Sequence, residues 1–553
     1  MSTDNIKNIY YNPSDYDRYS ILRDELKKEN RVEDLENIIE LMSPPKEIRS
    51  ICASNQGKNI KIAIIGANLS ALAAALELKK IGCNVTILEA SKRIGGRTYT
   101  YYFDRELNNY GDFGEMSIPV SHYTTWYYIN LLKLDTESFS DEIKYYYLRN
   151  NGFNNTEVDN LNNIYSQYNL TNEDKEKLEK KVHIGTLDKY LKYLTQDERR
   201  ELITIKENYC NKVLELDKLS LKKLYENQGF SKEGISIIGH LLGNKEYFQY
   251  SSLEFLEKIY TLDMTNKYTI NGGMIKLPFA LYEAIINNES YVYKDFKEEV
   301  GVVDFKLGFK IEEITSIDNK KINIKYRNLE DNVSEKENFD YVIYTEPVRN
   351  LKRIKINDKI SSEKLRAIDE IELVNLQKIY LYLKERFWEK KNNIKDLSGG
   401  RIITDLPLYS VYYPLVNDNM KESLECPTVL LASYNFANNN MFCNLDEKMK
   451  IEDTIRYLEL IHGLDEGYLD SILIDYNSLS WLDIKYSWGF STIFKTEEKT
   501  LYSYALTKPE INNRMFFAGE NYSIKHGTQQ GELQSGMIVA NNIAEEIVRQ
   551  VGK

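Results

Sequence analysis

The sequence KIAIIGANLSALAAALELKKIGCNVTILEASKRIGGR, residues 61–97, predicts a strand, a tight turn, a helix, a second strand and a glycine turn. Residues 62–65 are apolar without alternation, which is typical of a parallel strand buried on both faces. Gly66 permits the sharp turn, and small apolar side chains recur at helical spacing through residues 70–80. The free N–H groups and the dipole at the start of this helix favour a diphosphate. The segment therefore predicts the first βαβ unit of a dinucleotide-binding domain.

The phosphate-binding turn departs from the usual G-x-G-x-x-G pattern, because its three positions hold Gly66, Asn68 and Ala71. Asparagine tolerates the positive φ that glycine normally provides, but its side chain occupies space that a diphosphate would approach. Glu89 ends the second strand about 20 residues after the turn, where a carboxylate accepts hydrogen bonds from ribose hydroxyls. Alone, this pattern is equally consistent with a βαβ unit that binds no ligand.

The following residues, Glu89-Ala-Ser-Lys-Arg-Ile-Gly-Gly-Arg97, resemble the E-A-x-x-R-x-G-G-R segment of the flavin-dependent amine oxidases. That family includes L-amino-acid oxidases, monoamine oxidases and amino-acid monooxygenases. Further family-like segments appear in the family's order: GEMSIP at residues 114–119, NGGMIKLP at 271–278, DYVIYT at 340–345 and FAGE at 517–520. The resemblance therefore extends over nearly the whole chain from about residue 60.

The resemblance implies an α/β fold in which a Rossmann-like FAD-binding domain is interwoven with an α+β substrate domain, built on a mixed sheet, and a helical insertion. The expected divisions are an N-terminal helical arm (1–57), the FAD-binding domain (58–118, 263–350 and 501–553), the substrate-binding domain (119–165 and 351–500) and the helical domain (166–262). Helix-start patterns at Thr171 and Thr195 support the insertion. Residues 305–314 and 321–326 predict a strand pair around a turn at Asp318.

Composition and charge argue against several classes of function. The formal net charge is −12 and the pI is about 5.3, so nucleic acids and anionic membranes would be repelled. The five cysteines lack C-x-x-C pairing and the histidines lack metal-ligand spacing, which fits a reducing compartment and predicts no metal site. The sequence shows neither a signal-peptide pattern nor a long apolar run, so we expect a cytoplasmic protein that does not span a membrane. A homodimer is left open.

By resemblance the cofactor is FAD, and we expect it to be noncovalent because no cysteine lies near the FAGE motif. The residues expected to bind it are Gly66, Asn68, Ser70, Glu89, Ala90, Arg93, Gly96, Arg97, Met116, Ile311, Trp481, Gly519, Glu520, Gly527 and Thr528. Among them, Glu520 is expected to bind the ribityl or diphosphate part, and the backbone of Ile311 to lie against the adenine. Trp481 matches a tryptophan beside the isoalloxazine, although an ordinary core position is equally consistent. The helix that begins near Thr528 should point its N-terminus at the flavin C2 carbonyl.

Lys378 aligns with the family lysine that holds a water near flavin N5, and it is the expected catalytic residue. The segment DLPLYSVYYP, residues 405–414, resembles one whose tyrosine hydrogen-bonds the substrate carboxylate. Either Tyr412 or Tyr413 fits that part, and strand alternation places only one of them on the pocket face.

Two departures from the family concern the substrate pocket. Ser117 stands where the oxidases place an arginine that binds the α-carboxylate, and losing such a charge-assisted pair costs a few kcal/mol. Thr528 stands where many relatives place a bulky aromatic residue. We therefore expect a wider pocket that is less selective for anions, which Trp488 or His526 could refill.

The resemblance implies oxidation of a C–N bond by hydride transfer to flavin N5, imine hydrolysis, and reoxidation by dioxygen to hydrogen peroxide. An amine or a modified amino acid is the favoured substrate, because Ser117 removes the carboxylate-binding arginine. An amino-acid 2-monooxygenase and a flavin dehydrogenase are alternatives on the same scaffold. A further alternative is a non-catalytic binding or structural protein, because Asn68, Ser117 and Thr528 alter three functional positions.

Overall fold

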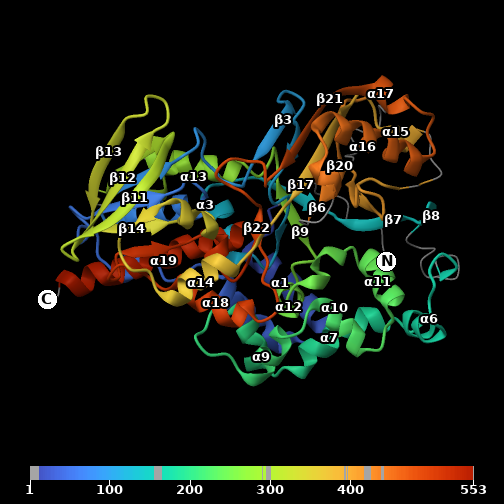
Figure 1. Ribbon diagram of the computed structural model, residues 1–553, viewed down its shortest axis with the longest axis horizontal. Helices are drawn as coiled ribbons and strands as arrows, with labels where there is room; N and C mark the ends of the chain where they lie inside the picture. The colour runs from blue at the N-terminus through green and yellow to red at the C-terminus, as the bar shows by residue number, and fades with distance from the viewer. Residues whose placement is uncertain are drawn as a thin grey trace.

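The computed structural model describes residues 12–154, 165–288, 291–293, 300–390, 394, 396–415, 425–436 and 441–551. Figure 1 shows two sheet-containing regions side by side, with a layer of helices beneath the second region. The first 11 residues of the predicted arm and residues 155–164 of the predicted substrate domain lie outside the described residues.

A five-stranded parallel sheet forms the core of the first region. In spatial order its strands are β10 (Val303–Leu307), β2 (Asn84–Glu89), β1 (Lys61–Ile65), β14 (Tyr341–Tyr344) and β23 (Met515–Phe517). Because every pair is parallel, the carboxyl ends of the strands meet at one edge of the sheet. This confirms the Rossmann-like unit predicted from residues 61–97.

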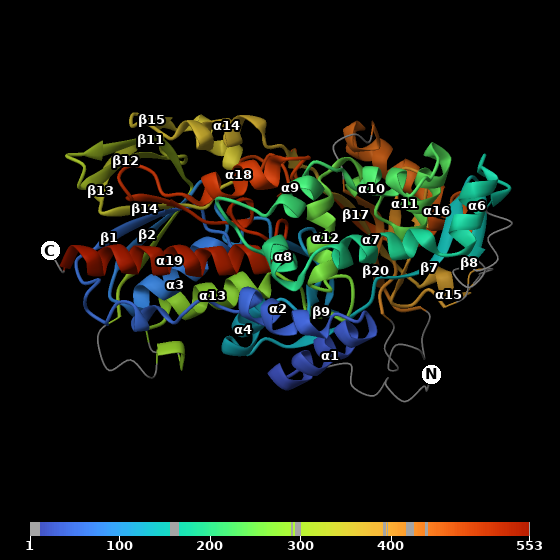
Figure 2. The same cartoon turned by 90° about the horizontal axis from the view of Figure 1, so that it is seen from below.

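Helix α3 (Leu69–Lys80) follows β1 and lies against α19 (Gln529–Val551) and α13 (Lys276–Ile286) (Figure 2). All its residues are buried, and its alanines allow the neighbouring helices to come close. A Cβ at Gly536 would lie 2.3 Å from the carbonyl oxygen of Ser70, so only glycine permits this approach. The packing places the N-terminus of α3 next to the first turns of α19.

The predicted strand at residues 305–314 is two strands. Its beginning belongs to β10 of the parallel sheet, and its end belongs to β11 (Phe309–Ile317) of a second sheet. Gly308 separates them with φ +84°, a conformation that β-branched residues avoid. The second sheet has the order β13 (Ser334–Phe339), β12 (Lys321–Asn328), β11 and β15 (Lys355–Ile356), and its β11–β12 hairpin turns at Asp318 as predicted.

A seven-stranded mixed sheet forms the second region. Its order is β21 (Leu473–Ser480), β17 (Gln377–Leu383), β20 (Thr428–Asn435), β19 (Ser410–Tyr412), β18 (Gly400–Thr404), β7 (Glu142–Leu148) and β8 (Asn151–Asn154). Only the β18–β7 pair is parallel among the pairs described. The apolar side chains of one face pack on α15 (Phe387–Lys390), α16 (Glu447–His462) and α17 (Tyr468–Ile472).

The helical layer and the N-terminal arm share one apolar core. Its helices are α6 (Asn172–Glu179), α7 (Val182–Tyr193), α8 (Gln196–Arg200), α9 (Asn211–Asp217), α10 (Leu221–Asn227), α11 (Lys232–Leu242) and α12 (Ser252–Tyr260), together with α1 (Asp15–Lys28) and α2 (Leu35–Met42) of the arm. Thr171 and Thr195 each form a capping box, which confirms both predicted helix starts. Buried Asp34 binds Arg199 Nε at 2.9 Å and so joins the arm to the layer.

Shorter elements connect these regions. They are β3 (Thr100–Asp104), β4 (Asn109–Asp112), β5 (Ile118–Pro119), α4 (Tyr123–Leu131), β6 (Thr136–Phe139), β9 (Lys267–Ile270), α14 (Ser362–Glu370), β16 (Leu373–Val374), β22 (Ser491–Thr492) and α18 (Glu498–Thr507). Within the described part of the chain, every helix is too short or too polar to cross a bilayer.

Candidate active site and cofactor groove

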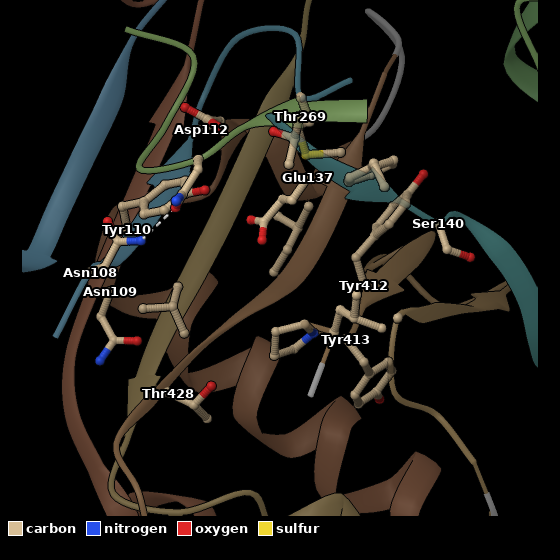
Figure 3. Close-up of a pocket in the computed structure, with 18 of the residues that line it drawn as sticks. Asn108, Asn109, Tyr110, Asp112, Glu137, Ser140, Thr269, Tyr412, Tyr413 and Thr428 are labelled. Atoms are coloured by element: carbon tan, nitrogen blue, oxygen red, sulfur yellow. Dashed lines mark hydrogen bonds between the residues drawn. The ribbon is translucent and has the colours of Figure 1, made fainter. Parts of the chain in front are cut away.

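Two adjoining cavities lie between the sheets. The inner cavity has a volume of about 170 Å³, and the outer cavity, drawn in Figure 3, has about 380 Å³. Met116, Phe139 and Tyr412 line both of them. The structure brings these predicted site residues together around the inner cavity: Met116, Ser117, Lys378, Tyr412, His526, Gly527 and Thr528.

Lys378, on β17, projects into the inner cavity and is buried. Its Nζ donates hydrogen bonds to the carbonyl oxygens of Asp112 at 2.7 Å and Gly114 at 2.6 Å. Burial penalises the ammonium and lowers the pKa of Lys378 to about 7, although the Asp112 carboxyl opposes this. In the neutral amine, two N–H groups donate to these two carbonyl oxygens. The lone pair on Nζ is then free to accept a hydrogen bond from water or to take up a proton. The lysine can therefore exchange a proton near neutral pH.

Only one of the two adjacent tyrosines reaches the inner cavity. The Tyr412 hydroxyl accepts a hydrogen bond from Arg401 Nη1 at 3.1 Å, and its ring lines both cavities. The Tyr413 hydroxyl lies 2.7 Å from His462 Nε2, and its ring packs on Trp388, although it also borders the outer cavity (Figure 3). The structure thus places Tyr412, rather than Tyr413, at the inner cavity.

The two predicted tryptophans lie outside both cavities. Trp481 is fully buried, and its Nε1 donates to the Phe113 carbonyl at 2.9 Å, so it is a core residue behind Phe490, which does line the inner cavity. The Trp488 ring stacks on Arg353, with the guanidinium carbon 3.7 Å from the ring centre. The expectation that Trp488 refills the pocket is therefore wrong, because Arg353 holds it elsewhere.

The glycines of the cofactor groove have conformations and contacts that require glycine. Gly66 has φ +104°, and a Cβ there would lie 2.5 Å from Thr345 Oγ1. Gly96, at φ +57°, would place a Cβ 2.7 Å from the Cβ of Asn68. Gly519 has φ +128°, and its N–H donates to Ser535 Oγ at 2.9 Å. These contacts bring the turn, the R-x-G-G-R segment and the FAGE motif together at the start of α3.

Asn68 is the N-cap of α3. Its φ is −85°, so the backbone here does not adopt the positive φ that asparagine would tolerate. The carboxamide donates to the Thr345 carbonyl at 2.6 Å and accepts from Ala71 N–H at 3.1 Å and from Ser70 Oγ at 2.7 Å. It is therefore fixed against the edge of the sheet, where it occupies one helix N–H group without adding charge.

A diphosphate fits the arginine at the mouth of this turn. Arg93 is largely buried with its guanidinium carbon 5.1 Å from the centre of the Tyr99 ring, and its Nη1 has no hydrogen-bond partner among the described residues. A buried guanidinium requires an acceptor, and a phosphate oxygen is a suitable one. Glu89 accepts from Ala67 N–H at 2.9 Å and Ser91 N–H at 2.7 Å, and thereby holds the turn in shape. Ala90 and Ile311 are buried close to the same strand ends.

Glu520, of the FAGE motif, fixes the far end of the groove. One carboxylate oxygen accepts from Arg97 Nη1 at 2.8 Å, and the other accepts from Gly527 N–H at 3.2 Å. Thr528 directly precedes α19, and its Oγ1 accepts a hydrogen bond from Gly531 N–H at 3.1 Å in the first turn of the helix. Arg97 and Glu520 thus hold the loop before α19 against the groove.

Two glutamates that sequence reasoning missed, buried Glu532 and half-buried Glu115, bind the helix starts on which cofactor binding depends. Glu532 accepts from the Leu69 N–H of α3 at 3.3 Å, and Glu115 accepts from the Gln529 N–H of α19 at 2.6 Å. Burial raises the pKa of Glu532 to about 7 and that of Glu115 to about 8. In neutral form neither carboxyl group repels a diphosphate or a ring carbonyl, so the groove fits a dinucleotide once both carboxyl groups hold protons.

Helix α12 supplies further residues to the inner cavity that the sequence did not indicate. Glu254 lies 3.2 Å from His526 Nδ1, and Lys258 follows one turn later on the same face. A recognisable signal was the i, i+4 pair of charges on an otherwise apolar helix. Among the described residues, no group of three or more His, Cys, Asp and Glu side chains has metal-binding geometry.

A Rossmann-like sheet, glycine turns that fit a dinucleotide and a buried lysine beside the inner cavity define a flavin-dependent oxidoreductase. The family description "Flavin containing amine oxidoreductase" matches residues 69–544, and the chain belongs to this family, whose members contain a flavin. The protein is accordingly an enzyme.

The comparisons also identify relatives. The chain is 30% identical over 499 residues to the putative L-amino-acid oxidase YobN of Bacillus subtilis (strain 168), covering 89% of this chain and 96% of that protein. It is 28% identical to an L-amino-acid oxidase of Crotalus adamanteus, covering 87% and 86%.

Solved structures share the fold at lower identity. Cyclohexylamine oxidase from Brevibacterium oxydans IH-35A has a TM-score of 0.64 at 14% identity, covering 89% of this chain and 100% of that chain. Putrescine oxidase has a TM-score of 0.63 at 16% identity, covering 89% and 99%. These likenesses confirm the α/β flavin amine oxidase fold expected from the sequence.

Proposed function

We propose that the enzyme oxidises the C–N bond of an amine or amino acid with noncovalent FAD, and that the resulting imine is hydrolysed. When bound, FAD supplies a hydride acceptor at N5 and passes the electrons to dioxygen, giving hydrogen peroxide. The observation that carries the proposal is Lys378, a buried lysine with a pKa near 7 beside a cavity at the dinucleotide domain. The oxidase relatives support the same reaction.

The residues of the inner cavity have separate tasks in this reaction. Lys378 Nζ is positioned to hold a water and to receive or return a proton. The rings of Phe490, Phe436 and Tyr434 line the cavity, and they exclude bulk water from the reacting carbon. Tyr412 supplies a hydroxyl that can orient a polar substrate group.

The residues that would hold the cofactor follow from the groove. The N–H groups at the start of α3 and the guanidinium of Arg93 would bind the diphosphate. Glu89 would bind the ribose, and the start of α19 would face the flavin pyrimidine ring. The described cysteines Cys52, Cys83, Cys210 and Cys426 are free, which supports a reducing compartment, the cytoplasm.

An absorption spectrum of the purified protein tests the proposal. We expect flavin bands that bleach anaerobically with an amine or amino acid, and hydrogen peroxide on admission of air. Flavin released by acid precipitation would show noncovalent binding. A colourless protein that cannot be reconstituted with FAD would contradict the proposal. An amide product would instead identify a monooxygenase, and slow reoxidation by air would identify a dehydrogenase.

A further inference from the structure

The charged side chains around the inner cavity are nearly all satisfied by the protein itself. Glu254 pairs with His526 at 3.2 Å, and Asp141 pairs with Lys267 at 2.7 Å. Lys378 is bound by two carbonyl oxygens. Lys258, on α12, also lines the cavity, but among the described residues its ammonium makes neither a hydrogen bond nor an ion pair.

Lys258 nevertheless remains charged. Burial opposes the ammonium, but the nearby Tyr247, Glu257, Asp263 and Glu254 together raise its pKa above the usual value. Its side chain is half-buried at the wall of the inner cavity, so an anionic ligand that enters the cavity can supply the acceptor that the protein does not.

Each acid near Lys258 is committed to a nearer cation. Glu257 binds Lys499 at 3.1 Å. Asp263 binds Lys525 at 2.8 Å. Glu254 faces His526, whose pKa it holds above the ordinary value even though burial favours the neutral ring. Lys258 is therefore available to an anion that enters the cavity.

We propose that Lys258 binds the carboxylate of the substrate, and that the substrate class is an amino acid rather than a simple amine. The inference rests on the proposed function and specifies its substrate. Ser117 and Tyr412 line the same cavity, so their hydroxyl groups can donate to the second carboxylate oxygen. Lys258 thus supplies, from the helical layer, the cation whose absence at Ser117 led the sequence to predict an amine.

A simple amine has no group for this lysine. A monoamine would leave the Lys258 ammonium without an acceptor, and its own protonated form would be repelled by it. An amino acid places its carboxylate at Lys258 and leaves its Cα–H and amine for the opposite side of the cavity. A site that leaves a charged group of its own unpaired discriminates strongly against the ligand that lacks the partner group.

The test compares substrate pairs that differ only in the carboxylate. Flavin-loaded enzyme is assayed for peroxide with L-phenylalanine against 2-phenylethylamine, L-leucine against 3-methylbutylamine, and L-lysine against 1,5-diaminopentane. We expect kcat/KM to favour at least one amino acid over its amine by about 100-fold or more. Equal or greater efficiency with the amines would overturn the inference and leave the proposed oxidase function intact.

Two substitutions at the site separate charge from packing. Lys258→Met should raise KM for the amino acid by about 30-fold or more with a smaller change in kcat, because it removes ground-state binding. Lys258→Arg should restore a large part of the affinity. Lys189→Met, at an exposed lysine of α7, is the matched control and should change neither constant. Unchanged KM in Lys258→Met would overturn the inference.

Carboxylate binding can be measured directly, so the inference can be tested even if no substrate is turned over. Benzoate, a carboxylate without an amine, is titrated by calorimetry into wild type and Lys258→Met, with thermal melts to verify that both fold. We expect the Kd to rise by about 30-fold or more in the variant. Equal benzoate affinity would overturn the inference, whereas the absence of flavin from wild type would defeat the proposed function alone.

Discussion

Glu532 lies with one carboxylate oxygen 3.3 Å from the amide nitrogen of Leu69, so a side chain from α19 binds the N-terminus of α3. Its other oxygen lies 3.7 Å from Arg97 Nη2. A cofactor diphosphate would be drawn to the same helix start, because the free N–H groups and the dipole attract anions. The protein therefore holds one of its own acids where the cofactor carries charge.

Affinity for FAD should consequently fall as the pH rises through about 7. Burial raises the pKa of Glu532 to about 7, with Arg97 lowering it and Glu520 raising it. Below that pH the carboxyl is protonated and does not repel the diphosphate. Above it, Glu532 must take up a proton when FAD binds. The Kd for FAD therefore rises by up to about tenfold per pH unit. Titration of the apoprotein with FAD between pH 6 and 9, followed by flavin fluorescence, measures this slope.

Glu532→Gln should bind FAD more tightly than wild type at pH 8.5 and with a shallower slope. Glu545→Gln, at an exposed position of the same helix, is the control and should follow wild type. Glu115, whose pKa is raised to about 8, contributes a second proton at higher pH, so the variant should retain part of its slope there. If the pH dependence of the Kd for FAD were the same in Glu532→Gln as in wild type, the Glu532 carboxyl of wild type would have to move away from the diphosphate without titrating.

Replacement of Lys378 by methionine should remove an ionisation near pH 7 from the pH profile of kcat. The pKa of Lys378 is about 7 because the amine is buried, and a positioned acid–base group contributes about 10²–10⁴-fold to its step. Stopped-flow reduction and reoxidation of the flavin at several pH values separate the two half-reactions. Lys384→Met, at the exposed end of the same region, is the control. A wild-type profile in Lys378→Met would exclude the lysine from proton transfer.

Local signals predicted the dinucleotide domain well because they do not depend on distant packing. The run at residues 62–65, the small residues of α3 and the capping boxes at Thr171 and Thr195 determine their elements through backbone geometry and nearest neighbours. The boundary between β10 and β11 was missed, because Gly308 interrupts an otherwise continuous β pattern.

The substrate pocket was predicted less completely, because its charges come from elements far apart in sequence. Lys258 and Glu532 are charged residues on helices, where a solvated face is the usual interpretation. The burial of Glu532 and the position of Lys258 at the cavity depend on how α19 and α12 pack. Trp488 was misplaced for the same reason, because Arg353 comes from a different part of the chain.

Substitution of Gly66 by alanine should destabilise the fold by about 2–4 kcal/mol. The new Cβ would be held at φ +104° and would lie 2.5 Å from Thr345 Oγ1, so backbone strain and a steric clash add together. Gly463→Ala is a matched control, because Gly463 has φ +60° but no atom within 4 Å of its added Cβ. The control should lose about 1 kcal/mol. Denaturant unfolding of the apoproteins measures both, and equal losses would show that the Thr345 contact relaxes.

Replacement of Glu254 by glutamine should destabilise the protein by about 3–5 kcal/mol near pH 6, because it leaves the buried His526 ring without its charged partner. The pKa of His526 is raised in the folded state, so its contribution is complete below its unfolded pKa of about 6.5 and is lost as pH rises through the folded value. The pKa of Glu254 is lowered, so its contribution is complete above about 4.5 and is lost as pH falls. The stability difference between wild type and Glu254→Gln should therefore be largest between about pH 4.5 and 6.5 and should decline on the alkaline side.

Glu226→Gln is the control, because it breaks only exposed pairs with Lys222 and Lys223. It should cost under about 1 kcal/mol at every pH. Unfolding at pH 5, 6, 7 and 8 gives the comparison, and a pH-independent difference would mean that the His526 ring stays neutral.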